Sequence, residues 1–134
     1  MKQTKDLYKA ITTDDIDVSK WVIGLPAYMY KGNEIIAIET EEDYFDIELE
    51  TLCQATGKFD KDKTMIFDGD VIEFEHKFGD KTVKETLTVY YSEQSASFML
   101  GIKDCLLPFG MYDVSKGKVI GNKYDFYLKG NQKK

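Results

Sequence analysis

The chain has 134 residues, 43% of them hydrophobic, and its formal net charge at pH 7 is −6. A chain of this length and composition can bury a sizeable core, which excludes a mainly disordered protein. No apolar run approaches the roughly 18 residues that cross a bilayer, and no apolar segment follows the first charged residues. We therefore expect no membrane span, no signal peptide and a cytoplasmic location.

The charge is unevenly distributed along the chain. Residues 1–57 carry five Lys against twelve acidic residues, residues 58–115 carry seven against eleven, and residues 116–134 carry six against one. All eighteen basic residues are Lys, which lacks the bidentate geometry with which Arg binds phosphate and guanine. Net negative charge also opposes the counterion release that drives binding to nucleic acid. Nucleic-acid binding is therefore disfavoured as the main function.

The basic end of the chain has three interpretations. It can solubilise the C-terminus, meet the acidic flank of a second copy, or contact nucleic acid through Lys charges and stacked Tyr rings. In the third interpretation the candidate contacts are Lys116, Lys118, Lys123, Tyr124, Tyr127 and Lys129.

The first predicted hairpin runs from residue 24 to residue 40. Gly32-Asn33 forms its two-residue loop, which places Tyr28 opposite Ala37. Both faces of this hairpin are apolar, so we expect it to be covered on two sides, either by the rest of the domain or by another subunit.

Shorter elements follow the first hairpin. Residues 50–56 are predicted to form a strand that enters a turn at Thr56-Gly57. A helical turn is predicted at residues 14–17 or 47–50. Helical periodicity is otherwise hard to find, because β-branched and aromatic residues dominate the chain.

The second predicted hairpin runs from residue 70 to residue 91, with Gly79-Asp80 as its loop. Its register places Ile72 opposite Leu87 on an apolar face, while the opposite face is polar. Further strands are predicted at residues 96–102 and 118–124. Short strands at this spacing, with Gly turns between them, indicate a small barrel or a sandwich.

Two titratable side chains fall on the apolar face of the second hairpin. Glu85 lies opposite Phe74, which indicates a bulge or a longer loop. His76 lies opposite Val83 near the loop, and we expect it to pack there, partly buried.

Several stretches of the chain are similar to the motifs of one family. They are residues 7–10 (LYKA) with 21–24 (WVIG), residues 50–57 (ETLCQATG), residues 60–71 with their IFDGDV end, and residues 119–125 (VIGNKYD). In this order they resemble the YopX family of phage and prophage proteins. The resemblance implies a β-rich fold with an SH3-like barrel core, a bacterial host, and no established activity.

Two segments depart from the family pattern. Residues 47–49 and 126–127 differ from it, so the resemblance does not extend to the turn before Glu50 or to the end of the last strand. The fold itself is not threatened by these departures.

We therefore predict a mainly β fold, an SH3-like small barrel core with additional hairpins, and few or no helices. The predicted layout is a single domain over residues 1–134, with a hairpin region at 1–57, a barrel core at 58–128 and a Lys-rich tail at 129–134. The motif residues predicted to have structural roles are Trp21, Gly24, Gln54, Thr56, Gly57, Asp68, Gly69, Asp70, Gly121, Asn122 and Tyr124.

No set of residues indicates catalysis, a cofactor or a metal. The densest acidic cluster holds Asp60, Asp62, Asp68 and Asp70, but an EF-hand loop needs Gly at its sixth and Glu at its twelfth position, and neither is present. We expect these acids to hold turns. In particular, Gly69 is expected at positive φ, with Asp70 bound to backbone amides.

The cysteines and the histidine do not form a zinc site. Cys53 and Cys105 are far apart in the sequence, and with His76 they fall short of four ligands. In a reducing cytoplasm we expect both cysteines to be small core residues.

The aromatic content favours an interaction protein. Nine Tyr, eight Phe and one Trp exceed what so small a core requires, and Tyr is enriched at protein interfaces. We predict a non-enzymatic phage or prophage accessory protein that works by protein–protein contact as a homo-oligomer, with an unknown phage or host protein as a further partner and no membrane partner. The alternatives are nucleic-acid association through the Lys-rich end and a metal-dependent hydrolase that uses the carboxylates of residues 60–70.

Overall fold

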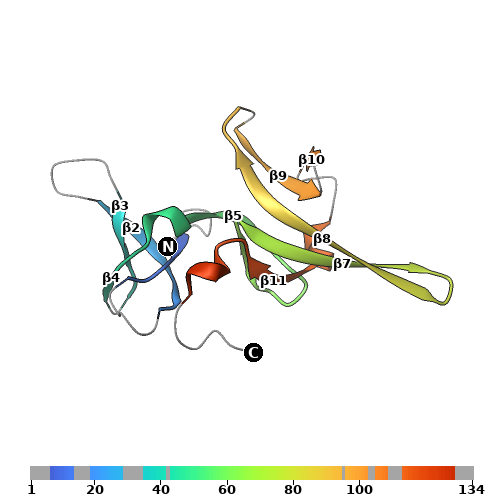
Figure 1. The fold of residues 1–134 in the computed structure, drawn as a ribbon, viewed down its shortest axis with the longest axis horizontal. Helices are drawn as coiled ribbons and strands as arrows, with labels where there is room; N and C mark the ends of the chain where they lie inside the picture. The colour runs from blue at the N-terminus through green and yellow to red at the C-terminus, as the bar shows by residue number, and fades with distance from the viewer. Residues whose placement is uncertain are drawn as a thin grey trace. The chain divides into compact units, whose positions relative to one another are not determined.

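The computed structural model describes residues 7–13, 19–28, 35–41, 43–94, 96–102, 105–108 and 113–128. The strands are β1 (Tyr8–Ile11), β2 (Trp21–Tyr28), β3 (Ile35–Glu39), β4 (Tyr44–Asp46), β5 (Cys53–Phe59), β6 (Met65–Phe67), β7 (Asp70–Phe78), β8 (Lys81–Ser92), β9 (Ser97–Ile102), β10 (Cys105–Pro108) and β11 (Lys118–Asn122). Within these ranges the helical residues are the 3-10 turns η2 (Leu49–Thr51), η4 (Val114–Lys116) and η5 (Asp125–Tyr127). The prediction of a mainly β fold is confirmed (Figure 1).

The chain divides into two compact units. Unit 1 consists of Met1–Ala55 and Tyr124–Lys134, and unit 2 consists of Thr56–Lys123. Strand β5 therefore starts in unit 1 and ends in unit 2. Residues 124–128, which the sequence assigned to the barrel core, belong to unit 1. The assignment of a single domain stays a prediction.

Unit 1 is a small antiparallel sheet that returns on itself. Its strands follow the order β4-β3-β2-β1-β5, and an isolated bridge between Thr12 and Ile47 links the end of β4 to the end of β1. This order, with η2 between β4 and β5, is compatible with an SH3-like barrel. The SH3-like barrel remains a prediction, and the sequence predicted it at residues 58–128. One buried hydrophobic cluster of unit 1 consists of Ala10, Val22, Ile38 and Ile47.

The predicted register of the first hairpin is wrong by at least one residue. Tyr28 pairs with Ile35 rather than with Ala37, because Ala37 pairs with Ala27 and the register shifts next to Tyr28. The shift is a bulge or irregularity between Ala27 and Tyr28, which alternation of side chains does not predict. Gly24 also allows a close backbone approach, since a Cβ there would fall on the carbonyl oxygen of Glu39. The predicted Gly32-Asn33 loop lies outside the described residues.

The strand predicted at residues 50–56 begins later than expected, because η2 precedes it. Thr51 explains the delay: its Oγ1 accepts a hydrogen bond from Ile11 N at 2.8 Å and donates one to the Glu48 carbonyl oxygen at 2.7 Å. These bonds hold the chain in a turn until β5 starts at Cys53. The turn predicted at 47–50 thus appears as a 3-10 turn shifted toward the C-terminus, and residues 14–17 lie outside the described ranges.

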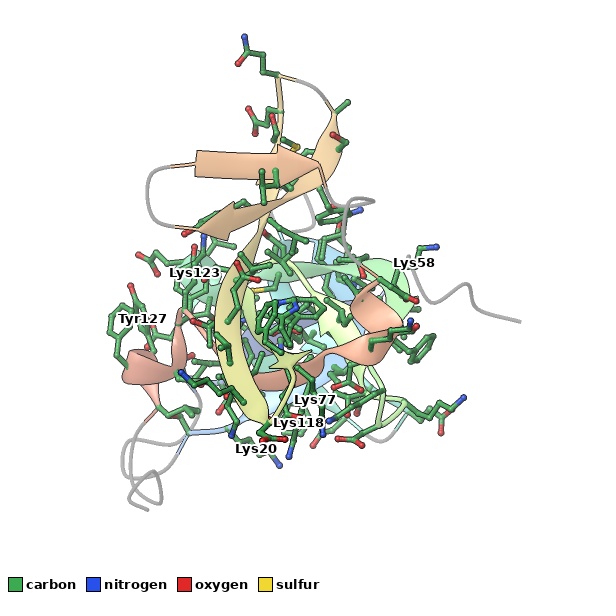
Figure 2. The ribbon with its side chains drawn as sticks, turned by 90° about the vertical axis from the view of Figure 1, so that its right-hand side faces the viewer. Lys20, Lys58, Lys77, Lys118, Lys123 and Tyr127 are labelled. Carbon is green, nitrogen blue, oxygen red and sulfur yellow. The ribbon has the colours of Figure 1, made fainter. Side chains whose placement is uncertain are left out.

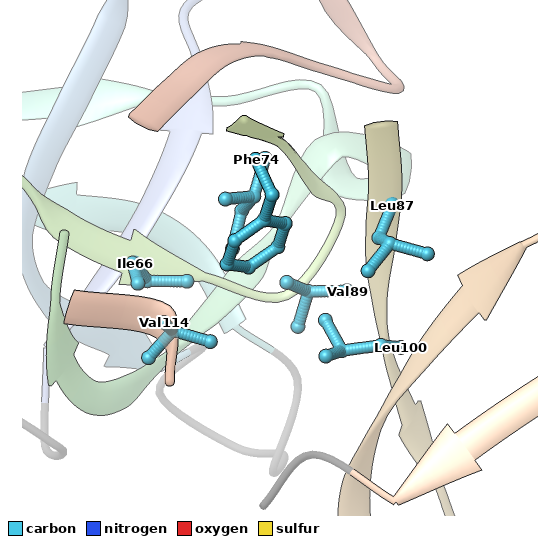
Figure 3. Packing of buried hydrophobic residues seen from close by; sticks show 7 residues of the cluster. Ile66, Phe74, Leu87, Val89, Leu100 and Val114 are labelled. Atoms are coloured by element: carbon cyan, nitrogen blue, oxygen red, sulfur yellow. The ribbon is translucent and has the colours of Figure 1, made fainter. Parts of the chain in front are cut away.

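Unit 2 is built on a five-stranded antiparallel sheet in the order β10-β9-β8-β7-β11, and β6 pairs with β5. The core lies against one face of this sheet, where Val114 in η4 and Ile66 in β6 cover residues of β7, β8 and β9 (Figure 3). Gly117 fits closely over this core, since a Cβ there would come within 2.5 Å of Ile72 Cγ2 and 2.8 Å of the Phe74 ring. The hydrophobic cluster of this core consists of Ile66, Ile72, Phe74, Leu87, Val89, Leu100 and Val114.

The predicted register of the second hairpin is confirmed. Ile72 pairs with Leu87, and the remaining pairs follow without a shift to the Gly79-Asp80 turn. The bulge or longer loop suggested by Glu85 opposite Phe74 is therefore wrong. Glu85 Oε1 instead lies 3.0 Å from His76 Nε2 on the same face, so the two polar side chains form a hydrogen-bonded pair.

The two later strands that were predicted differ from prediction only at their ends, and β10 was not predicted. β9 starts one residue later than expected, and β11 stops at Asn122 instead of residue 124. A bulge interrupts the pairing of β11 with β7 between Val119 and Gly121. No helix in the described ranges has the length and hydropathy that a bilayer span requires.

Candidate functional site

The Asp68-Gly69-Asp70 turn at the start of β7 is a structural motif of unit 2. Gly69 has a φ of 88°, a conformation that glycine adopts at little cost. The Asp70 side chain is fully buried, and its Oδ2 accepts a hydrogen bond from Phe67 N at 2.7 Å. Asp68 Oδ1 accepts one from Tyr91 N at 3.1 Å. The predicted role of this turn, with positive φ at glycine and Asp70 bound to the backbone, is confirmed.

A second motif stretch, at the end of β11, contacts this turn. Asn122 Nδ2 donates to Asp70 Oδ1 at 2.9 Å, and Lys123 N donates to the Gly69 carbonyl oxygen at 2.9 Å. Gly121 pairs with a residue of β7 next to the same turn. Two segments more than fifty residues apart are therefore joined by one buried carboxylate.

Asp60 plays a similar part at the turn between β5 and β6. Its Oδ1 accepts hydrogen bonds from Asp62 N at 2.9 Å and Thr64 N at 2.8 Å, and its Oδ2 accepts one from Val119 N at 2.8 Å. Burial alone would raise the pKa of Asp60, but these backbone bonds, with the charge of Lys118, lower the pKa below its usual value. This carboxylate holds β11 to the β5–β6 turn.

These hydrogen bonds show that Asp60, Asp68 and Asp70 of the acidic cluster hold turns and strands of unit 2 together. The carboxylates of Asp60 and Asp70 are occupied by backbone and amide donors. Burial raises the pKa of Asp68, although Lys123 and the Tyr91 amide act in the opposite direction. Among the residues that the structure describes, no group of three or more His, Cys, Asp or Glu side chains could hold a metal ion.

The Gln54 to Gly57 motif lies where β5 passes from unit 1 to unit 2. Gln54 pairs with Tyr8 of β1. Thr56 Oγ1 donates to the Ile66 carbonyl oxygen at 2.9 Å, and Gly57 has a φ of 86°. The motif therefore shapes the strand and presents no reactive group.

Trp21 is the centre of an aromatic and charged cluster in unit 1. Its Nε1 donates to Asp125 Oδ1 at 2.9 Å, and Lys9 Nζ lies 4.8 Å from its ring centroid. An open hollow of about 390 Å³ adjoins it, lined by residues 20–23, Thr40, Glu41 and Phe45. The lining mixes both charges with apolar rings, and Lys20 already lies over the Phe45 ring at 5.0 Å. The hollow therefore indicates no single class of ligand.

The Lys residues proposed to contact nucleic acid do not form one basic surface in unit 2. Lys118 pairs with Glu73 across β11 and β7. Lys123 Nζ lies 4.6 Å from the centroid of the Tyr90 ring. Figure 2 shows Lys118 and Lys123 at separate places on unit 2. The cations are thus spread out, and two of them lie beside a carboxylate or an aromatic ring.

The remaining members of that set are placed differently. Lys116 is exposed at the end of η4. Tyr124 and Tyr127 belong to unit 1, where their rings meet edge to face with centroids 6.2 Å apart, a geometry that leaves little room to stack a base between them. Lys129 lies outside the described residues.

The end of the β7–β8 hairpin carries an exposed apolar face that the sequence motifs did not point to. β9 pairs with β8 from Thr88 onward, and β11 reaches no further than Glu73 on β7. Among the described strands, residues 74–85 therefore pair only with one another, and Figure 1 shows this segment extending past β9 and β11. We call residues 74–85 the β7–β8 ribbon.

Phe78 and Val83 are the apolar residues of this ribbon that remain accessible. Phe78 is 64% exposed and Val83 is 47% exposed. Both lie on the same face as the buried pair Ile72 and Leu87, since side chains two residues apart share a face. The sequence contained the signal, because the predicted register already placed Val83 on the apolar face. What it could not show was where the neighbouring strands end.

Comparison with known proteins gives a family and no individual relative. The family model described as YopX protein matches residues 6–126. A search of the curated proteins gives no match, and a search of the solved structures gives none either.

Proposed function

Because the chain belongs to the YopX family, we propose that it is a phage- or prophage-encoded accessory protein that works in the bacterial cytoplasm through protein–protein contact and not through catalysis. The phage setting rests on the family resemblance. The contact rests on the exposed apolar face of the β7–β8 ribbon, which is the observation that carries the proposal.

The ribbon supports an interaction role because its tip, the end at the Gly79-Asp80 turn, has exposed apolar side chains. No other described strand pairs with it there. A two-stranded ribbon is marginally stable in water unless a third strand or another surface covers its apolar face. Here Phe78 and Val83 remain exposed on that face. Apolar groups gathered on an exposed surface commonly mark a site of protein contact.

The acidic cluster gives little support to the hydrolase alternative. Acid–base catalysis needs carboxyl groups that can reach a substrate and that differ in environment. The oxygens of Asp60 and Asp70 instead accept hydrogen bonds from the backbone and from Asn122. We therefore propose that these residues stabilise unit 2 and carry no reaction.

Nucleic-acid association through the Lys-rich end remains the alternative, with weaker support. Lys118 and Lys123 lie next to Glu73 and Asp68, which reduce the local positive potential. The alternative predicts retention of the full chain on single-stranded DNA at low salt and release as salt is added. If the full chain is not retained on single-stranded DNA at low salt, this alternative is excluded.

The proposal is tested by affinity recovery from bacterial cells in which the prophage has been induced. The tagged full chain is compared with Phe78→Ser/Val83→Ser and with a control, Lys77→Ser/Thr82→Ala, changed on the other face of the ribbon. We expect a bound protein, either another protein or an untagged copy of the chain, to be recovered by the wild type and the control and lost from the first variant. Equal recovery by all three chains would contradict the proposal.

A further inference from the structure

The β7–β8 ribbon has an unusual pattern of side chains on its apolar face. Along β7 this face carries Phe74, His76 and Phe78, and along β8 it carries Glu85, Val83 and Lys81. The three cross-strand pairs, from base to tip, are Phe74 with Glu85, His76 with Val83, and Phe78 with Lys81. Along β7, His76 thus has an aromatic residue on each side, Phe74 and Phe78. Along β8, Val83 has a residue of opposite charge on each side, Glu85 and Lys81.

We propose that this face packs against the same face of a second copy, about a two-fold axis that passes through the pair His76 and Val83. The inference deepens the proposed function, on which it rests, by naming the partner as a second copy of this chain. A two-fold interface must be self-complementary, since residue i meets residue j and residue j meets residue i.

The charges on β8 meet that requirement. Lys81 lies two residues from Val83 toward the tip, and Glu85 lies two residues from Val83 toward the base. The two-fold axis runs across the two strands, through His76 and Val83, between the two copies. A half-turn about it exchanges the two positions, so Lys81 of each copy faces Glu85 of the other. Lys81 and Glu85 therefore form two opposite-charge pairs across the contact, which is the electrostatic complementarity that favours association. His76 lies on the axis and faces His76 of the other copy, beside the Glu85 carboxylate 3.0 Å away within its own chain.

The apolar residues fit the same arrangement. Val83 of one copy meets Val83 of the other at the axis, and Phe78 of each copy points toward the base of the other ribbon. There the apolar contact ends, because Gly117 already covers the Phe74 ring within the chain. The shared apolar surface is formed by Phe78 and Val83 of the two copies, both exposed in the single chain.

The opposite face of the ribbon does not offer the same match. Its pairs are Glu73 with Thr86, Glu75 with Lys84, and Lys77 with Thr82, all polar. Lys84 Nζ lies 4.0 Å from Glu73 Oε1 within the chain. This face is therefore the solvated one, and it provides control positions for the test.

The test uses sedimentation velocity of the full chain over a range of concentrations. Wild type is compared with Lys81→Glu, on the proposed contact face, and with Lys77→Glu, which makes the same charge change on the opposite face. We expect a reversible dimer for the wild type and for Lys77→Glu. Lys81→Glu places two like-charge pairs in the contact, so we expect its dimer dissociation constant to rise about tenfold or more.

The charge swap Lys81→Glu/Glu85→Lys makes the test specific to the two-fold arrangement. It restores both opposite-charge pairs, and we expect it to recover the dimer, while Glu85→Lys alone loses it. Melting curves of each variant show that the chain remains folded. The inference is overturned if Lys81→Glu behaves like Lys77→Glu, if the swap fails to recover the dimer, or if the wild type stays a monomer throughout. A wild-type monomer that still recovers another protein through Phe78 and Val83 would overturn this inference alone and leave the proposed function standing.

Discussion

The base and the tip of the β7–β8 hairpin share one apolar face but differ in how far the side chains of that face are buried. At the base, Ile72 and Leu87 are almost completely buried beneath Val114 and Ile66. At the tip, Phe78 and Val83 continue the same face, yet half or more of Phe78 and nearly half of Val83 remain exposed. The difference shows that strand alternation sets which side chains share a face, while the reach of the neighbouring strands decides which of them are covered.

The largest expected effect is the loss of a buried side chain at the base. Leu87→Ala is expected to lower the free energy of unfolding by about 2–5 kcal/mol, because it removes transfer energy and leaves a cavity. Val83→Ala, measured at a concentration where the chain is monomeric, is expected to lower it by less than about 1 kcal/mol. Urea unfolding followed by circular dichroism measures both. Equal losses at the two positions would show that the tip is packed within the single chain.

A smaller difference is expected between two glycines. Gly117→Ala is expected to cost about 1–3 kcal/mol because the new Cβ would press on Ile72 and Phe74 at the base. Gly79→Ala meets no atom within 4 Å and is strained only by its φ of 62°, so we expect a cost of about 1 kcal/mol. Thermal melting of both variants measures the order. A larger loss for Gly79→Ala would mean that the tip is more tightly held than the base.

The two aspartates near the base are expected to respond to pH with opposite signs. The pKa of Asp60 is lowered from 3.8 in the folded chain, so its contribution to stability is present above that pH and is lost as the pH falls through the folded pKa. The pKa of Asp68 is raised from 3.8, so its contribution is present at acid pH and is lost as the pH rises through the folded pKa.

Melting temperatures of wild type, Asp60→Asn and Asp68→Asn between acid and neutral pH test these signs. We expect the advantage of wild type over Asp60→Asn to shrink as the pH is lowered. Relative to Asp68→Asn, wild type is expected to lose stability as the pH is raised. Parallel curves for all three proteins would contradict the assigned contacts.

The smallest effect on folding is expected at the tip itself. His76 and Glu85 form a partly exposed pair with 3.0 Å between Nε2 and Oε1. Such pairs contribute little in water, so His76→Ala is expected to change the free energy of unfolding of the monomer by less than about 1 kcal/mol. Chemical denaturation at low protein concentration measures this change, and a loss as large as that of Leu87→Ala would remove the distinction between tip and base.

The register of the second hairpin could be predicted because local signals agree there. Gly69 marks the turn before the hairpin and Gly79 marks the turn of the hairpin itself. One polar face alternates with one apolar face, so a slip by one residue would bury the polar set. The first hairpin lacks this constraint, since both of its faces are apolar. Its pairing contains a register shift between Ala27 and Tyr28 and a close approach of Gly24 to the backbone of Glu39, and alternation reveals neither.

The structural role of the acids was only partly predictable from the sequence. Asp70 lies beside the glycine turn, and its bond to Phe67 N is local. The bond from Val119 N to Asp60 Oδ2 joins residues 59 positions apart, and no short motif encodes that distance. For the same reason, the Lys residues near the C-terminal end formed a plausible basic set in the sequence, although their neighbours in unit 2 include Glu73, Asp68 and Tyr90.

The most direct measurement of the proposed contact is an isotope-filtered NOE experiment on an equal mixture of ¹³C-labelled and unlabelled full chain. It detects only protons that are close together on different copies. We expect cross-peaks from the Val83 methyl groups of the labelled copy to Val83 and Phe78 of the unlabelled copy. Intermolecular cross-peaks that involve other surfaces and leave Val83 silent, or no intermolecular cross-peaks at millimolar concentration, would contradict the account.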